Sequence, residues 1–552
     1  MAGRSRQSEP GLVQANRENW GSKIGVILAV AGSAVGLGNF LRFPGLAATH
    51  GGGVFMIPYF ISMLILGIPI CWVEWSMGRY GGSRGYNSAP GIFTVLWRTS
   101  YSKYFGALAI LIPVVIYMYY VYIEAWCLLY ALDYLSGTMS WIAEQSGLEV
   151  QTQAYQTHFD RLVGMQKNGF PAGRTLIVLG FVFLLNFYLI YRGLTRGIET
   201  FCKFAMPVLI LCAIIILGRV LTLGTPNPAK PEANIDNALG FMWNPKPDAT
   251  GSVWGNLANA ELWLAASGQI FFSLSVGFGI ILNYASYLRK DDDVALSGLT
   301  ASAMNQFCEV CLGGMITVPV AFLFLGPANL TKEVLGSSMA LGFNALPAVF
   351  SLMPAGRWFG AIWFFMLFTA AITSSLSMLQ PAIAFFEEAF RLGRRASVTC
   401  LGFVVAMGGL VVIYFSKNLL ALDTMDFWVG TVCIFMLATI QVITVGWIFG
   451  IDNARKEVQR GAELWVPYIF WFIIKYISPV YLITIFIAWC YYSIPSKIAE
   501  LRALDVEDRN TVLFVLTFLV ATFIFFTMLI YLSSRRWRWD TSPDPDVEKV
   551  IP

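Results

Sequence analysis

The sequence predicts an all-α integral membrane protein, and three observations support this fold class. Hydrophobic residues make up 57% of the 552 residues and charged residues only 13%, about half the charged share of a soluble protein. About twelve apolar runs of roughly 20 residues follow one another, each long enough to cross a bilayer as a helix. Two of these runs are interrupted near their middle by similar glycine-rich segments.

The apolar runs define the expected spans and the side on which the termini lie. An even number of spans places both termini on one side, and cytoplasmic termini put about 23 basic residues inside and about 11 outside, as the positive-inside rule favours. We therefore expect cytoplasmic N- and C-termini. The spans cover approximately 23–48, 53–79, 105–136, 174–192, 197–222, 260–288, 294–324, 356–390, 396–416, 425–451, 465–495 and 510–533.

The two interruptions are close copies of each other. Val35-Gly36-Leu37-Gly38 lies in the first span and Val276-Gly277-Phe278-Gly279 in the sixth. Glycine weakens a helix interior by about 1 kcal/mol, and lipid offers the freed backbone no replacement hydrogen bonds. An offset of five spans gives the copies opposite orientations, as in transporters with inverted repeats, although close helix packing is an alternative reason for the glycines.

This pattern divides the chain into five parts. We expect a cytoplasmic N-terminal segment, which the family resemblance described below supplies with gate residues, two repeats of five spans each, two further spans, and a cytoplasmic tail. The N-terminal segment lacks the apolar core of a signal peptide before about Ile24. The boundaries are 1–22, 23–222, 260–451, 452–533 and 534–552.

Two broken helices at mid-membrane predict a binding site for a zwitterion and a cation. Freed carbonyl groups near Ala34 and Ser273 suit a desolvated monovalent cation, and the positive end of a half-helix that starts near Leu37 suits a carboxylate. A potassium-type channel would need a re-entrant pore loop and fourfold assembly. An enzyme would need a cluster of catalytic side chains, and the chain has only two histidines. We therefore expect no enzyme activity.

Six motifs resemble the neurotransmitter:sodium symporter family, and in particular its bacterial leucine transporter. The similarity runs from about Trp20 to the last span and implies a leucine-transporter-like fold with a 5+5 inverted repeat. It also implies sodium-driven symport by alternating access. The motifs are GNFLRFP (38–44), WVEWSMGRYGG (72–82), YYVYIEAW (119–126), GQIFFSLSVGFG (268–279), TSS with QP (373–375, 380–381) and MDFW (425–428).

The resemblance implies two Na⁺ ions as the only cofactors. All-oxygen ligand sets suit hard cations. Hydroxyl groups that bond back to their own helix are the common alternative for Thr373 and Ser374. The first ion would be held by Ala34, Asn39, Ser273, Asn305 and the substrate carboxylate; the second would be held by Gly32, Val35, Ala370, Thr373 and Ser374.

The resemblance also implies where an amino acid binds. Its carboxylate would meet the amides of Leu37 and Gly38 and the hydroxyl of Tyr120. The ammonium would meet the carbonyls of Ala34, Phe272 and Ser273 and the Ser275 hydroxyl, and the side-chain walls would be Ile116, Tyr120, Phe272, Phe278, Ser375 and Met378. No acidic residue lies in that wall, which favours a neutral, aliphatic substrate of small to medium size. Ile116 and Met378 are bulkier than their leucine-transporter counterparts, so alanine or glycine stays an alternative to leucine.

Glu309 follows Asn305 by four residues and shares its helix face. Chloride-dependent members of the family typically have a serine there, next to a bound chloride whose partners match Tyr59, Gln269 and Ser273. A carboxylate would supply the negative charge itself, which predicts chloride independence. Proton counter-movement through Glu309 is a further hypothesis.

The gates are also implied by the resemblance. Arg42 and Asp426 match the external pair, and Arg17 with Glu388 matches the cytoplasmic pair. Glu388 replaces the usual aspartate of the family, and Arg17 acting only as a positive-inside residue is the alternative.

Short tails predict the inner (plasma) membrane of a prokaryote. The expected partners are a small neutral amino acid, the lipid bilayer and a second copy in a homodimer, without nucleic acid. An amino-acid sensor on the same fold, or transport of a related small amine or zwitterion, remains the alternative function.

Overall fold

The computed structural model describes residues 19–145, 151–165, 170–226, 228, 230–247 and 251–537, which are almost entirely helical. Within these residues, one isolated antiparallel bridge joins Gly52 and Pro245. The helices of the first half are α1 (Lys23–Ala34), η1 (Gly38–Arg42), α2 (Phe43–Thr49), η2 (Gly53–Phe55), α3 (Met56–Ser62), η3 (Met63–Gly67), α4 (Ile68–Ser83), α5 (Ala89–Trp97), η4 (Ser102–Phe105), α6 (Gly106–Ser136), α7 (Thr138–Gln145), α8 (Gln151–Val163), α9 (Gly173–Tyr191), η5 (Leu194–Glu199) and α10 (Thr200–Leu221).

The second half continues the helical pattern to Trp537. Its helices are α11 (Ile235–Trp243), η6 (Trp254–Ala258), α12 (Ala260–Leu274), α13 (Ile280–Ala285), α14 (Val294–Gln306), η7 (Phe307–Gly313), α15 (Gly314–Leu325), η8 (Pro327–Asn329), α16 (Lys332–Gly336), η9 (Ala340–Ala345), α17 (Leu346–Leu352), α18 (Gly356–Met378), α19 (Gln380–Phe390), α20 (Arg394–Tyr414), η10 (Lys417–Leu419), α21 (Leu420–Phe427), η11 (Trp428–Cys433), α22 (Ile434–Ile443), η12 (Thr444–Gly450), α23 (Ile451–Gln459), α24 (Tyr468–Phe472), η13 (Ile473–Ile477), α25 (Ser478–Ala503), α26 (Val506–Leu532) and η14 (Ser534–Arg536).

The expected spans are present. Among the described residues, ten helices are long and apolar enough to cross a membrane, and the bent pair Lys23–Ala34 and Gly38–Thr49 forms an eleventh span. The sixth predicted run, 260–288, is split into α12 and α13, of 15 and 6 residues. At 1.5 Å per residue neither piece crosses a bilayer alone. The predicted all-α membrane fold is therefore confirmed.

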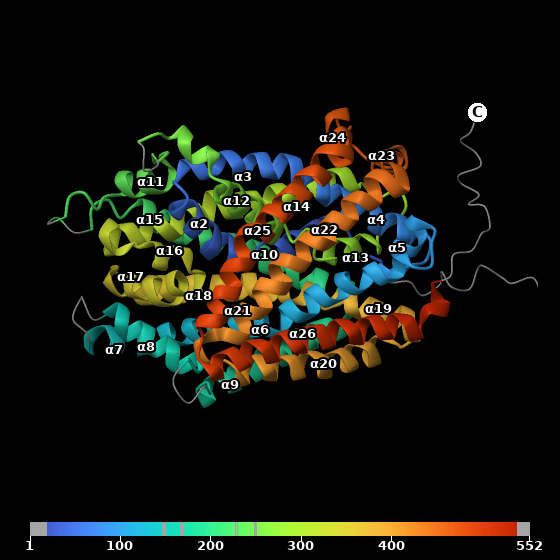
Figure 1. Cartoon of the computed structure of the whole chain (residues 1–552). Helices are drawn as coiled ribbons and strands as arrows, with labels where there is room; N and C mark the ends of the chain where they lie inside the picture. Colours follow the sequence, from blue (N-terminus) through green and yellow to red (C-terminus); the bar gives the residue numbers. More distant parts are fainter. Residues whose placement is uncertain are drawn as a thin grey trace, which may run out of the picture.

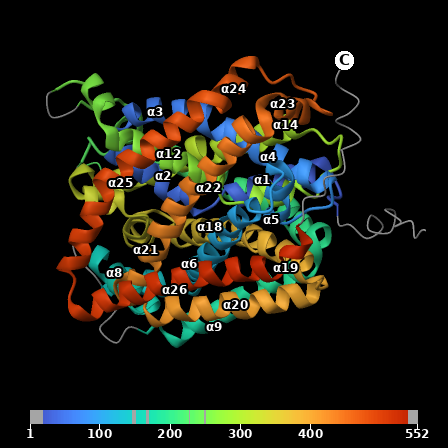
Figure 2. The same ribbon diagram turned by 45° about the vertical axis from the view of Figure 1, so that its right-hand side comes forward.

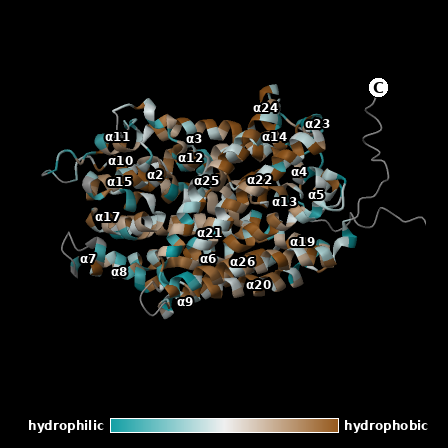
Figure 3. Cartoon of the chain, in the orientation of Figure 1, coloured by the Kyte–Doolittle hydropathy of each residue, from teal (hydrophilic) through white to brown (hydrophobic). Residues whose placement is uncertain are grey.

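The spans form a buried centre and an outer layer. The most apolar stretch of the span containing α6 is 100% buried, against 28% for α9 and 22% for α26. In both views α9, α20 and α26 lie along one outer edge (Figures 1 and 2). Hydrophobic residues cover α20 and α26, whereas hydrophilic residues gather in α7, α8 and α23 near the two ends (Figure 3). The outer helices therefore present the surface that suits lipid.

The helices run across Figure 1 between two ends of the molecule. One end, on the left, carries α7, α8, α11 and α17, and the other carries α5, α19, α23 and the end of the described chain. We call the end with Trp537 the termini side and the opposite end the vestibule side.

Both glycine-rich segments are breaks in their helices, as predicted. The first span bends by 50°, because α1 stops at Ala34 and the π-helix η1 begins only at Gly38. In the sixth span Ser275, Gly277 and Gly279 have φ values of 53°, 77° and 83°, a left-handed backbone that favours glycine. A Cβ at Gly279 would lie 2.8 Å from the Ala109 carbonyl oxygen. Position 279 therefore needs glycine both for the turn and for the close approach of α6.

Buried Glu74 supports the second break. Its Oε1 accepts hydrogen bonds from the Gly277 amide at 3.3 Å and from Gln441 Nε2 at 2.7 Å. A freed backbone N–H inside a membrane protein needs such a partner. Glu74 therefore has a structural role at this break.

Candidate functional site

The four protein residues predicted for the first sodium meet between the two breaks. Asn39 Nδ2 donates to Asn305 Oδ1 at 2.8 Å and to Ser273 Oγ at 3.4 Å. Asn305 Oδ1 also lies 3.2 Å from the carbonyl oxygens of Ala34 and Ser273. Three oxygens that face one another repel unless a cation lies among them. If the Asn305 side-chain amide rotates by about 180°, its nitrogen donates to both carbonyls. This side chain therefore suits the site both with and without a cation.

The five residues predicted for the second sodium also converge. Ser374 Oγ lies within hydrogen-bond distance of three carbonyl oxygens, 3.2 Å from that of Gly32, 3.4 Å from that of Val35 and 3.1 Å from that of Ala370. Thr373 Oγ1 lies 3.0 Å from the Ala370 carbonyl. Both hydroxyls thus bond back to their own helix, as the alternative interpretation expected, and Ser374 in addition reaches across to α1. Carbonyl and hydroxyl oxygens from two helices surround one point, without a carboxylate.

The amide end of η1 faces the aromatic residues predicted to bind the amino acid. A Cβ at Gly38 would lie 2.8 Å from the Phe272 ring, and one at Gly36 would lie 3.0 Å from the Tyr120 hydroxyl. Ser275 Oγ donates to the Ser33 carbonyl at 3.1 Å. Amide and phenol donors therefore lie on one side of the break and carbonyl acceptors on the other, an arrangement that suits a zwitterion.

The predicted side-chain walls are buried except for Phe272, which is half-buried, and one of them is directed elsewhere. Ile116, Phe278 and Met378 are each at most 5% exposed. Ser375 Oγ donates to Asn186 Oδ1 of α9 at 2.8 Å, and Asn186 Nδ2 donates to Glu124 Oε1 of α6 at 3.0 Å. The Ser375 hydroxyl is thus committed to a neighbouring helix rather than to the break. Sequence analysis missed Asn186, whose only signal is a lone amide within an apolar run.

Glu309 lies beside the first oxygen cluster with all three predicted partners. It accepts hydrogen bonds from the Tyr59 hydroxyl at 2.7 Å, from Gln269 Nε2 and from Ser273 Oγ. The side chain is fully buried in the π-helix η7, and such helices are frequent at functional sites. Three donors directed at one point describe an anion site that this carboxylate occupies.

A vestibule leads from the surface to this site. The cavity of about 430 Å³ is lined by Gly38, Tyr120 and Phe272 together with the predicted gate residues Arg42 and Asp426. The Arg42 guanidinium lies 4.6 Å from the centroid of the Phe272 ring, and Asp426 Oδ1 accepts from Tyr119 Oη at 2.7 Å. Neither a hydrogen bond nor an ion pair joins Arg42 to Asp426, both of which are described. Both residues line the vestibule without bonding to each other, and their role as a gate stays a prediction.

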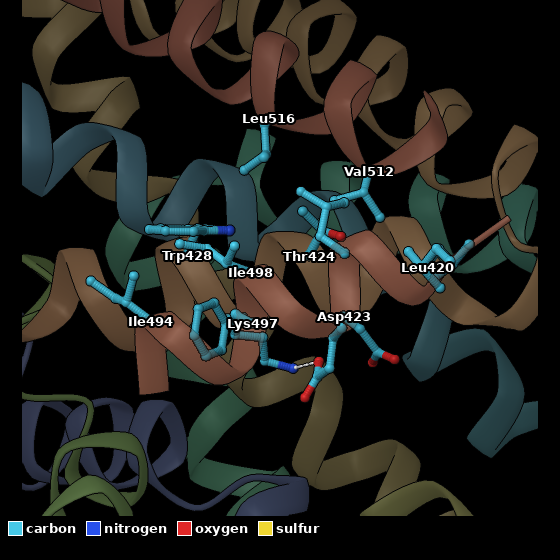
Figure 4. A pocket seen from close by; sticks show the side chains of 13 residues that line it. Leu420, Asp423, Thr424, Trp428, Ile494, Lys497, Ile498, Val512 and Leu516 are labelled. Carbon is cyan, nitrogen blue, oxygen red and sulfur yellow. Dashed lines mark hydrogen bonds and ion pairs between the residues drawn. The ribbon is translucent and has the colours of Figure 1, made fainter. Parts of the chain in front are cut away.

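A second pocket, of about 300 Å³, lies on the other face of α21 between α25 and α26 (Figure 4). Asp423 lines both this pocket and the vestibule. Within this pocket Lys497 pairs with Glu500, with 2.6 Å between Nζ and Oε2 (Figure 4). Most of the other side chains that line the pocket are apolar. Without a broken helix or converging donors, this pocket is not the candidate site.

The termini side is closed by buried aromatic and acidic residues. Trp20 is 7% exposed and its Nε1 donates to the Tyr284 carbonyl at 2.9 Å, so it packs the start of the described chain against α13. Glu388 accepts four hydrogen bonds, including one from Trp537 Nε1. Arg17 lies outside the described residues, so its predicted pair with Glu388 stays a prediction.

Sequence analysis missed one further contact on this side. Glu199 of η5 is 1% exposed and accepts hydrogen bonds from the Gly21 amide at 2.8 Å and from Ser22 Oγ at 2.9 Å. Lys203 pairs with the same carboxylate at 2.8 Å. The carboxylate thus holds the start of α1, and nothing in the local sequence around Glu199 indicates this distant partner.

Comparisons with known proteins agree with this geometry. A sequence model described as the sodium:neurotransmitter symporter family matches residues 17–535. The uncharacterized sodium-dependent transporter MJ1319 of Methanocaldococcus jannaschii is 30% identical over 475 residues, which are 84% of this chain and 89% of that protein. An uncharacterized sodium-dependent transporter of Haemophilus influenzae is 27% identical over 496 residues, 86% of this chain and 98% of that protein.

A solved structure shares the fold. The crystal structure of MhsT in complex with L-phenylalanine superposes with a TM-score of 0.71 at 25% sequence identity. The similarity covers 86% of this chain and 99% of MhsT. The expected leucine-transporter-like architecture is therefore confirmed.

Proposed function

The chain belongs to the sodium:neurotransmitter symporter family, and from this premise we propose that it couples two Na⁺ ions to the uptake of a neutral amino acid. It is a multi-pass, sodium-dependent membrane transporter and not an enzyme. The substrate class, the number of ions, independence of chloride and the alternating-access mechanism are our proposal.

One observation carries the proposal. Two all-oxygen clusters flank the break of the first span, and the amide end of η1 faces the same space. Carbonyl and hydroxyl ligands without a carboxylate favour a monovalent hard cation over a divalent one. The Ala34 carbonyl and Asn39 belong to the first cluster, and Asn39 Oδ1 accepts at 2.8 Å from the Gly36 amide, which directly precedes the Leu37 and Gly38 amides in the chain. A substrate carboxylate at these amides would therefore complete the first ion's ligand set, which couples ion binding to substrate binding.

The walls favour a neutral side chain of small to medium size. Ile116, Phe278 and Met378 are apolar and buried, and the Glu124 carboxylate is bound by Asn186, which in turn accepts from Ser375. Burying a charged side chain there without a partner would be costly. MhsT, similar over most of the chain, was crystallised with L-phenylalanine, which is also neutral.

Chloride independence rests on Glu309. Its carboxylate already receives the three donors that would otherwise face an anion. A chloride ion next to it would be repelled at close range. We place the termini side in the cytoplasm because basic residues favour that side. The membrane we propose is the inner membrane of a prokaryote. A homodimer is compatible with the exposed outer helices.

Uptake of labelled amino acids into proteoliposomes tests the proposal. We expect accumulation driven by an inward Na⁺ gradient, none with K⁺, and equal rates in chloride and in gluconate. Ser374→Ala, which removes a hydroxyl from the second cluster, should weaken the apparent sodium affinity about tenfold or more. Ser416→Ala is a matched control, since that buried hydroxyl donates to the Gly164 carbonyl at 3.4 Å and belongs to neither oxygen cluster. Sodium-dependent binding without accumulation would indicate a sensor, and no sodium response would contradict the proposal.

A further inference from the structure

The Glu388 carboxylate at the end of α19 is fully hydrogen-bonded. Its Oε2 accepts from the amides of Asn87 and Ser88, each at 2.9 Å. Its Oε1 accepts from Ser88 Oγ at 2.8 Å and from Trp537 Nε1. A carboxylate offers about four acceptor positions, and four donors occupy them here. An additional cation would have to displace one of these donors.

The glycine at position 91 makes this arrangement possible. A Cβ at Gly91 would lie 2.6 Å from Glu388 Oε1. The absence of a side chain in α5 therefore lets the longer glutamate reach the start of that helix. There the carboxylate also meets the positive end of the helix dipole.

Trp537 is built into the protein rather than lying on its surface. It follows the short turn η14 and is 0% exposed, whereas its neighbour Arg535 is exposed. Its ring stacks on Phe385 of α19, with 5.9 Å between centroids and 20° between planes. Burial of a complete indole with its N–H bonded to a carboxylate fixes the end of α26 against α19.

The same cluster reaches one of the two broken spans. Asn283 Nδ2 of α13 donates to the Asn87 carbonyl at 2.9 Å, and the Asn87 amide donates to Glu388. α13 also carries Tyr284, whose carbonyl holds Trp20. A continuous set of hydrogen bonds therefore joins Trp537, Glu388, the loop before α5 and the half-helix α13.

We propose that Trp537 locks the cytoplasmic gate by completing the hydrogen-bond shell of Glu388. This inference rests on the proposed alternating-access function, in which α1 and α13 must leave the termini side for sodium and substrate to exit. The indole N–H is the donor that comes from outside the two repeats. Its release frees one acceptor position on Glu388 and loosens the loop that holds α13. Trp537 is thus a positioning residue, which acts on α13 through Glu388 and Asn87.

Cys202 provides a native reporter for gate opening. Its thiol is fully buried in α10 and lies 3.5 Å from the position of a Cβ on Gly32 of α1. When α1 moves away from α10, this thiol becomes accessible from the termini side. Its alkylation by a membrane-impermeant maleimide, quantified on the Cys202 peptide by mass spectrometry, measures the open fraction without knowledge of the substrate.

The experiment compares full-length variants in vesicles with the termini side exposed to the reagent. In Na⁺, Trp537→Phe keeps an aromatic ring against Phe385 and removes the donor, so we expect Cys202 to react about tenfold faster, the usual scale for a hydrogen bond to a charged group. Arg535→Gln, in the same tail without such a contact, should react as the wild type does. Ser88→Ala removes another donor from the same Oε1 and should accelerate labelling in the same direction.

Three outcomes are decisive. Equal rates for Trp537→Phe and Arg535→Gln would overturn the inference, because ring packing alone would then hold the gate. Acceleration by Arg17→Gln together with no effect of Trp537→Phe would also overturn it, since Arg17 would then be the residue that holds Glu388. Wild-type labelling that is the same in Na⁺ and in K⁺ would contradict the proposed sodium-driven function itself, and this outcome is separate from the comparison of the variants.

Discussion

The two ends of the molecule are built in opposite ways. On the vestibule side, Arg42 and Asp426 line a cavity of about 430 Å³ without bonding to each other. On the termini side, Glu199 and Glu388 each bind several donors, and Trp537 is fully buried against Glu388. The candidate site therefore opens towards the vestibule side and is closed towards the termini.

This difference predicts how each of the two proposed gates works. The vestibule gate uses long charged side chains and an aromatic ring, groups that move by rotating about single bonds. The termini side is closed by backbone amides and indole N–H groups bound to carboxylates, so opening it requires whole helices to move. The vestibule gate should thus respond to substrate, and the termini side should determine the stability of the outward-facing state.

The largest effect is expected where α1 packs on Glu199. A Cβ at Gly25 would lie 2.0 Å from Glu199 Oε1, so Gly25→Ala must displace the carboxylate or the helix. We expect sodium-driven accumulation in proteoliposomes to fall about a hundredfold, because loss of a buried charged contact costs about 3 kcal/mol. Gly218→Ala in α10 has open space around it and is the matched control. Equal activity of the two variants would show that the contact with Glu199 is not needed.

The second largest effect is expected for substitution of Glu309. Glu309→Ser leaves Tyr59, Gln269 and Ser273 facing an empty anion position. We expect uptake about tenfold slower in gluconate, where a buried anion is missing, and recovery in chloride. The measurement is initial uptake against chloride concentration. If this variant is equally slow in both salts, Glu309 does not replace a chloride ion.

A smaller effect is expected at the vestibule gate. Arg42→Gln and Asp426→Asn should each weaken substrate binding about fivefold, because the pair forms only when the vestibule closes over substrate. In the double variant the loss should be less than the sum of the single losses, by about 1 kcal/mol. Equilibrium binding at fixed Na⁺ measures all four proteins. Strict additivity would mean that the two side chains do not meet in the closed state.

The smallest effect is expected at Ser22, the residue that caps the start of α1. Ser22 Oγ accepts a hydrogen bond from the Gly25 amide at 3.0 Å and donates to Glu199. Ser22→Ala removes this helix cap and should lower stability by about 1 kcal/mol. Thermal unfolding of the detergent-solubilised protein should show a slightly lower midpoint. Thr331→Ala, which removes a cap on the vestibule side, indicates whether the termini side is the more sensitive of the two.

The sequence predicted the framework of this protein because that framework depends on local properties. The length of an apolar run determines whether a helix can cross a bilayer. Glycines in two such runs indicate where the helices break, and Gly277 and Gly279 adopt the left-handed backbone that only glycine accepts easily. The oxygen groups of the candidate sites, such as Ala34, Asn39 and Ser374, follow from motifs next to those breaks.

The tertiary structure alone decided what the long side chains and chain ends bind. Ser375 turns to Asn186 instead of the break, Glu388 is held by Ser88 and Trp537, and Glu199 holds the start of α1. These contacts join residues that lie far apart in the sequence, so neither composition nor periodicity encodes them. A hydrogen bond forms only when donor and acceptor are about 3 Å apart, and the packing of the helices brings these groups to that distance. The open vestibule and the closed termini side are consequences of this packing.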